Sequence, residues 1–151
     1  MSVYASNTNV SSEKSKAEIE RTLRRYGAEE FVSGWDQDKA VIMFKMENRR
    51  IRIYIPMPNK EDFRKTASGR QRTNELAIEQ SWEQASRQRW RSIALVIKAK
   101  LEYVSSGMKT IEEEFMSDIV MPNGKNLGAW VVPQIAAAYE NKKMPPLLGA
   151  G

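Results

Sequence analysis

The residues of this sequence whose types and spacing could do chemistry are arginines and lysines that gather in two consecutive segments. The first segment, residues 57–72, has no hydrophobic period and carries Arg64, Lys65, Arg70 and Arg72. The second is the following run, which is free of proline and glycine up to residue 106 and carries Arg87, Arg91 and Lys98. Guanidinium groups pair with phosphate oxygens through two parallel hydrogen bonds, and a mobile loop can follow a phosphate backbone. We therefore predict that these residues bind nucleic acid; the alternative is an ordinary solvated surface.

A third group of polar side chains is expected on the outer face of a β-sheet. Arg50, Arg52 and Tyr54 alternate with isoleucines, and Lys45 belongs to the preceding strand. Cations beside an aromatic ring suit single-stranded nucleic acid, because the cations neutralise the backbone while a base stacks on the ring. The alternative is an exposed sheet face whose charges deter edge-to-edge aggregation.

Residues suited to catalysis are scarce. The chain has neither Cys nor His, which excludes thiolate catalysis and zinc knuckles and removes the commonest general base. Asp36, Asp38 and Lys39 suggest part of a metal-dependent nuclease, but a carboxylate on a second strand is missing. The acids of residues 112–118 could hold Mg²⁺, although a helix start explains them more simply. We expect a protein that is not an enzyme and uses no metal or cofactor.

The composition indicates one globular domain with an anionic partner. Of its 151 residues, 41% are hydrophobic and 28% are charged, close to globular averages. The formal net charge of +5 favours an anionic partner, and residues 60–100 carry most of the excess. No apolar run approaches the ~20 residues that span a bilayer, and the N-terminus lacks the apolar core of a signal peptide. We expect a cytoplasmic protein with no membrane contact.

A first helix is predicted at about residues 16–26, after a flexible tail of residues 1–14. Ser15 and Glu18 have the spacing of a capping box, in which both side chains satisfy free amides of the first turn. Gly27 is suited to end the helix, because glycine adopts the left-handed conformation without a steric penalty.

From residue 30 the hydrophobic period changes from 3.6 to two. Three antiparallel strands joined by short turns are predicted at residues 31–35, 40–46 and 51–55. One face of this meander is strongly apolar and needs a cover. A long helix within residues 73–106 is the expected cover, with Trp90 at the edge of its apolar stripe. The stripe is predicted to consist of Ile78, Trp82, Ala85, Ile93, Val96, Ile97, Leu101 and Val104.

The remaining residues predict two further helices. Thr110 and Glu113 form a second capping box before a short acidic helix. Its apolar positions are Ile111, Phe115 and Ile119. A turn at residues 121–124 precedes a last helix at residues 127–141. The side chains expected to be buried there are Trp130, Ile135, Ala138 and Tyr139, with Pro133 near the first turn or at a kink.

The predicted fold is therefore α+β, with an N-terminal helix, a three-stranded antiparallel meander, a long helix packed on one sheet face and two C-terminal helices. Residues 15–143 form a single domain, and residues 144–151 form a C-terminal tail. The order of the elements is α-β-β-β-α-α-α.

Three segments resemble a family of small uncharacterised proteins encoded in bacteriophage and prophage genomes. They read AEIERTLRRYGAEEFVSGWDQDKAVIMF, SWEQASRQRWRSIALVIKAKLEYVSSG and TIEEEFMSDIVMPNG. The resemblance implies a phage gene product in the bacterial cytoplasm, where single-strand binding, annealing and defeat of host defences are common roles. Our leading hypothesis is a non-catalytic protein that binds nucleic acid, DNA more than RNA, as a monomer or a homo-oligomer. The alternative is an anti-defence inhibitor or assembly factor that binds a host or phage protein.

Overall fold

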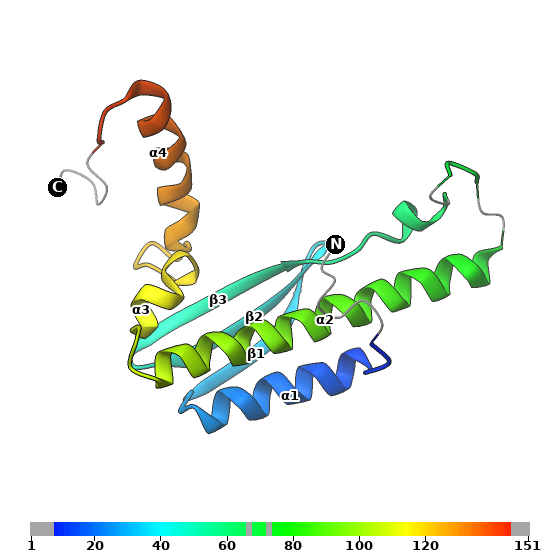
Figure 1. Cartoon of the computed structure of the whole chain (residues 1–151), viewed down its shortest axis with the longest axis horizontal. Coiled ribbons are helices and arrows are strands. Elements are labelled where there is room, and N and C mark those ends of the chain that lie inside the picture. Colours follow the sequence, from blue (N-terminus) through cyan, green and yellow to red (C-terminus); the bar gives the residue numbers. More distant parts are fainter. Residues whose placement is uncertain (1–7, 66–67, 72–73, 146–151) are drawn as a thin grey trace.

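The protein has the α+β architecture that the sequence predicts (Figure 1). The computed structural model describes residues 8–65, 68–71 and 74–145. Its helices and strands are, in chain order, α1 (Ser12–Arg25), β1 (Glu30–Asp36), β2 (Lys39–Met46), β3 (Arg49–Pro56), the 3₁₀ helix η2 (Lys60–Phe63), α2 (Glu75–Ser105), α3 (Ile111–Glu114), the 3₁₀ helix η3 (Met116–Asp118) and α4 (Leu127–Asn141). Residues 1–7 and 146–151, which are half of the predicted N-terminal tail and most of the predicted C-terminal tail, lie outside the described residues.

Helix α1 begins one turn earlier than its predicted capping box. The Oγ of Ser11 accepts a hydrogen bond from the backbone N–H of Lys14 at 3.1 Å and caps the helix. The expected cap, Ser15, is instead fully buried, and its Oγ has no hydrogen-bond partner among the described residues. Ser11 offers the same hydroxyl four residues before Ser15, so the helix gains a turn and residues 12–14 do not belong to a tail. Gly27 ends the helix as predicted, with a φ of +99°.

The three strands form an antiparallel meander in the order β1-β2-β3. Two-residue turns join them, and both residues of the second turn, Glu47 and Asn48, have positive φ, as in a type I′ turn. The side chains of Ala40, Ile42, Phe44, Met46, Ile51 and Ile55 are buried on one face, as the alternation predicts. The opposite face bears Lys45, Arg50, Arg52 and Tyr54. Lys45 pairs directly with Arg50 across the strands, and Arg50, Arg52 and Tyr54 follow one another along β3.

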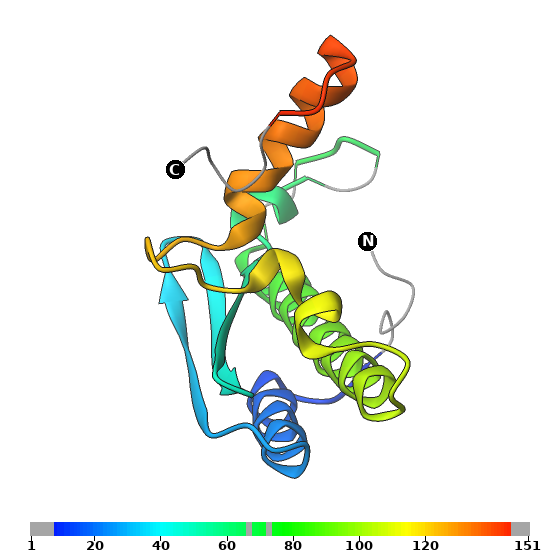
Figure 2. The ribbon, with the colours of Figure 1, turned by 90° about the vertical axis from the view of Figure 1, so that its left-hand side faces the viewer.

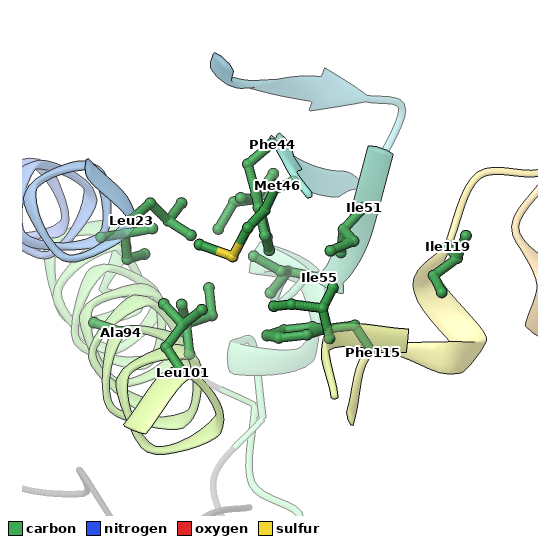
Figure 3. Close-up of a cluster of buried hydrophobic side chains, with 14 of the residues drawn as sticks. Leu23, Phe44, Met46, Ile51, Ile55, Ala94, Leu101, Phe115 and Ile119 are labelled. Atoms are coloured by element: carbon green, nitrogen blue, oxygen red, sulfur yellow. The ribbon is translucent and has the colours of Figure 1, made fainter. Parts of the chain in front are cut away.

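Helix α2 lies across the apolar face beside α1 and closes the core (Figure 1). Figure 3 shows how side chains from both helices, β2, β3 and the α3 region meet there. Trp90, predicted at the edge of the stripe, is only 5% exposed, whereas Val96 is 39% exposed and lies outside the core. The buried stripe of α2 is Ile78, Trp90, Ala94, Ile97 and Leu101. It differs from the prediction because α1 and the sheet cover α2 from two sides.

The acidic segment forms the single turn α3 and then η3, with Ile111, Phe115 and Ile119 buried as predicted. The capping box of Thr110 and Glu113 is present, with hydrogen bonds of 3.1 and 3.0 Å. Phe115 meets Phe44 edge to face, with ring centroids 5.6 Å apart. This contact ties the C-terminal segment to the core.

Helix α4 has the predicted bounds but not the predicted burial. It stands away from the rest of the domain and contacts it chiefly through η3 (Figures 1 and 2). The side chains of Trp130, Ile135 and Tyr139 are 38%, 47% and 83% exposed, so their predicted burial is wrong. Pro133 lies inside the helix, beyond its first turn. Of the helices in the described residues, none combines the length and apolar character needed to span a membrane.

Candidate nucleic-acid interface

The structure places the predicted loop cations before the start of α2. The guanidinium of Arg64 is held between two carboxylates, those of Glu61 and Glu75, each at 2.8 Å. These hydrogen bonds, with Glu75 the larger cause, raise the pKa of Arg64 above its ordinary value. Lys65 and Arg70 are exposed, whereas Arg72 lies outside the described residues. The charge of Arg64 is therefore largely used in ion pairs within the chain.

The helix cations are also partly used inside the molecule. The guanidinium of Arg91 pairs with the carboxylate of Glu18 at 2.5 Å and joins α2 to α1. Arg87 donates to the side-chain oxygen of Gln84 one turn earlier on α2, and Lys98 is half-buried. Arg91 thus belongs to a helix–helix contact, whereas Arg87 keeps a neutral partner and its full charge.

The sheet cations lie on the face opposite α2, so they do not join the helix cations in one patch. Arg52 donates to the side-chain oxygen of Asn126 at 3.1 Å and to the carbonyl of Gly124 at 2.8 Å. It therefore anchors the loop before α4. Arg50 pairs with Glu30 at 3.4 Å. The ring of Tyr54 has Arg52 and Lys39 at 5.3 and 5.8 Å from its centroid, so its predicted stacking surface is flanked by cations.

A cleft that the sequence did not reveal lies at the other end of the domain. It has a volume of about 440 Å³ and is enclosed by the start of α1, the β1–β2 turn, the segment after β3 and the first half of α2. Three of the four tryptophans of the chain line it. We refer to the space between Trp35, Trp82 and Trp90 as the tryptophan cleft.

The three rings differ in how firmly they are held. Trp90 is nearly buried and lies beneath the ammonium of Lys16, 4.7 Å from the ring centroid. Trp82 is half-buried, and its indole N–H donates to the carbonyl of Pro58 at 2.9 Å, which fixes the ring. Trp35, by contrast, is 76% exposed. The cleft therefore combines two fixed rings with one that is free to stack on a ligand.

Trp35 is exposed although it lies on the apolar face of the sheet. It pairs across the strands with Ala40, whose side chain is 3% exposed on the core face. Cross-strand partners point to the same face, so Trp35 follows the alternation of β1. At this end of β1, next to the turn, the helices cover Ala40 but leave the ring of Trp35 exposed. An exposed aromatic ring on a core face is unusual, because burying it would remove 150–250 Å² from water.

Charges of both signs surround the rings. The carboxylates of Glu13, Asp38 and Glu83 line the cleft together with the cations of Lys16 and Arg87. Carboxylates accept hydrogen bonds from exocyclic amino groups, whereas arginine and lysine bind phosphate. Such a lining matches an aromatic ring that carries amino groups and is attached to an anion.

One more lysine lies close to the cleft. The ammonium of Lys60 is 5.9 Å from the ring centroid of Trp82 and pairs with Glu79 of α2. The hydrogen bond with Glu79 raises the pKa of Lys60 above its ordinary value.

The sequence held one signal for this site. The alternation in β1 places Trp35 on the apolar face directly before a turn, where a helix cover could end. The sequence nevertheless favours the core for these tryptophans, because Trp82 lies on the predicted stripe of the long helix and Trp35 flanks apolar neighbours. No local pattern indicates that Trp35 meets two tryptophans so far away in the chain. Among the predicted binding residues that the structure describes, only Arg87 lines the cleft.

Asp36 and Asp38, the carboxylates suggested for a nuclease, are both exposed at the β1–β2 turn. Within residues 8–65, 68–71 and 74–145, no three histidine, cysteine, aspartate or glutamate residues are grouped so as to hold a metal ion. Comparisons of the chain with protein-family models, curated proteins and solved structures gave no match. The resemblance to phage proteins accordingly stays a prediction.

Proposed function

We propose that this protein binds single-stranded nucleic acid without catalysis, seating an unpaired base in the tryptophan cleft. The observation that carries the proposal is Trp35, a 76% exposed ring beside two fixed tryptophans and the cations of Lys16 and Arg87. Stacking of a base on an aromatic side chain contributes about 1–3 kcal/mol. The ring of Trp35 offers most of its surface for this contact.

The cleft favours a single strand over a duplex. Its rings lie within a concave site between elements, and a base inside a duplex cannot enter such a site without leaving its stack. The carboxylates of Asp38 and Glu83 can then accept hydrogen bonds from the amino group of an entering base. Arg87 supplies the phosphate contact, because within the described residues its hydrogen-bond partner is the neutral amide of Gln84 and it forms no ion pair.

Binding is tested with fluorescently labelled DNA and RNA oligonucleotides, single- and double-stranded, by anisotropy at low and moderate salt. We expect single strands to bind more tightly, and Trp35→Ala to weaken this binding about 5- to 100-fold, the equivalent of one stacked base. The matched control is Val32→Ala, a substitution at an exposed position on the outer face of the same strand. Unchanged affinity in Trp35→Ala, or equal affinity for duplex, contradicts the proposal.

The salt dependence tests which cations meet phosphate. For single strands, each neutralised phosphate contributes about 0.7 to the slope of log affinity against log salt. Arg87→Gln is expected to reduce that slope by about this amount, whereas Arg50→Gln, on the opposite sheet face, is expected to leave it unchanged. Arg91→Glu is unsuitable as a probe, because it would place a carboxylate beside Glu18 and weaken the contact between α1 and α2.

A further inference from the structure

The apolar side chains of α4 form an exposed seam. Val132, Ile135 and Tyr139 are 60%, 47% and 83% exposed and follow one another at intervals of three and four residues. This spacing places them on one face of the helix. Between Leu127 and Asn141 no side chain is buried. A helix of such apolar character is normally covered by another surface.

The charges on α4 favour a second copy of this chain as the cover. Between residues 127 and 140, the only ionisable side chains are those of Tyr139 and Glu140. Two α4 helices can therefore approach each other without repulsion between like charges. A helix that lies on a membrane surface would carry a polar face rich in lysine and arginine. No such face exists on α4, whose remaining positions are mostly glycine, alanine, valine and proline.

We propose that α4 pairs in antiparallel fashion with α4 of a second copy of the chain, with a twofold axis beside Ile135. Ile135 lies between the other two members of the seam, so an antiparallel pair is self-complementary. Ile135 meets the partner's Ile135, and Val132 meets the partner's Tyr139. A contact of this kind is isologous and closes at the dimer. The proposal does not depend on the tryptophan cleft.

The area of the seam alone is too small for a firm dimer. A 15-residue helix is ~22 Å long and ~10 Å across, so one side of it offers roughly 350 Å². Two such sides bury about 700 Å², below the ~1,200 Å² at which stable interfaces begin. Further contact must come from the rest of the domain, next to the base of α4.

A groove suited to this contact adjoins the base of α4. It has a volume of about 790 Å³, and its apolar lining comes from Met116, Ile119, Val120, Met121, Pro122 and Leu127. Arg49 and Glu112, which pair with each other, and the cations of Lys45 and Arg50 lie at the same groove. In an antiparallel pair the end of one α4 reaches the base of the other. The partner's Glu140 then comes close to these two cations, and the pair is a weak, reversible dimer.

Cysteine cross-linking tests the register, because the chain contains no cysteine of its own. Ile135→Cys is expected to form a disulfide between copies on mild oxidation. A mixture of Val132→Cys and Tyr139→Cys is expected to cross-link. Each of these two variants oxidised by itself is expected to stay uncross-linked. The control is Ala137→Cys, an exposed position on the opposite side of the helix. Efficient cross-linking of Tyr139→Cys alone indicates a parallel pair and contradicts the proposal.

The mass in solution tests the pairing itself. Analytical ultracentrifugation of the full chain over a wide concentration range is expected to show reversible formation of twice the 17.3 kDa mass. Ile135→Glu and Tyr139→Glu are expected to weaken dimerisation about 30-fold or more, and Ala137→Glu to leave it unchanged. Circular dichroism checks that each variant is folded. A chain that stays monomeric at all concentrations overturns the proposal, and so does a dimer that persists in both seam variants. A monomer whose α4 binds a different protein also overturns it.

Discussion

Helices α2 and α4 carry similar apolar side chains at similar spacing, yet their surroundings differ completely. On α2, Ile97 and Leu101 are each 1% exposed beneath the sheet. On α4, Ile135 and Tyr139 are 47% and 83% exposed. The difference lies in what faces each helix, since α2 crosses a sheet and α4 leaves the domain after its first turn (Figure 2). A helical pattern thus shows that a face is apolar, but not which surface covers it.

The cations show a similar contrast between arginines that are paired within the chain and those near the tryptophan cleft. Arg64, Arg91 and Arg52 bind carboxylates or carbonyls of their own chain, so these residues stabilise the fold. Around the tryptophan cleft, the ring of Trp35 is instead exposed and the charge of Arg87 is not neutralised. Our two proposals rest chiefly on side chains that the fold leaves exposed, Trp35 at the cleft and the seam of α4.

The largest expected effect separates the core from α4. Phe44→Ala removes a ring that is 1% exposed and packed on Phe115, and is expected to lower the free energy of unfolding by about 3–5 kcal/mol. Tyr139→Ala, measured on dilute protein where the chain is monomeric, is expected to change it by no more than about 0.5 kcal/mol. Chemical denaturation followed by circular dichroism compares the two. A large loss in Tyr139→Ala would show that α4 packs on its own domain.

An intermediate effect is expected at the junction between the two regions. Arg52→Ala removes the hydrogen bonds to Gly124 and Asn126 that hold the loop before α4, which should cost about 1–2 kcal/mol of unfolding free energy. Arg50→Ala, two residues earlier on β3, loses only an exposed pair with Glu30 and should cost about 0–0.5 kcal/mol. Hydrogen exchange of the backbone N–H of Leu127, which donates to Ile119, should quicken in the first variant alone.

The smallest expected effect concerns the contact between α2 and the α3 region. Burial of the Glu114 carboxylate would raise its pKa, but hydrogen bonds and charges from Lys100 and Lys109, each at 3.3 Å, outweigh burial and lower the pKa. A carboxyl whose pKa is lower in the folded state adds stability above its ordinary pKa, and this stability is lost as the pH falls through the folded value.

Glu114→Gln is therefore expected to lower the unfolding free energy by about 1 kcal/mol at pH 7 and by less as the pH falls below 4.5. Denaturation of both proteins across this range measures the difference. Burial raises the pKa of Asp118, so the effect of this group on stability has the opposite dependence on pH. Asp118 is present in both proteins, so its effect cancels when the two are compared. The control is Glu112→Gln, whose pair with Arg49 is exposed and should contribute almost nothing. An equal loss at pH 4 and pH 7 would show that the Glu114 charge is not involved.

Local patterns predicted most of the fold. The alternation around Ile42 and Ile55 identified the strands and their buried face, and the capping box of Thr110 and Glu113 is formed as expected. The cap of α1 was missed because Ser11 and Ser15 are chemically equal and only packing distinguishes them. The surroundings of the predicted binding residues were predicted less well. Whether an arginine such as Arg91 is available depends on an acid 73 residues away, Glu18, which no local pattern indicates.

The sequence by itself determined the elements, the two-faced sheet and the turns that join them, because these follow from backbone preferences and from apolar periods of two and 3.6. Only the tertiary structure decided which cations are paired, that Trp35, Trp82 and Trp90 line one cleft, and that α4 is left uncovered. These outcomes depend on distances between residues far apart in the chain. Such distances are set by how the helices pack on the sheet.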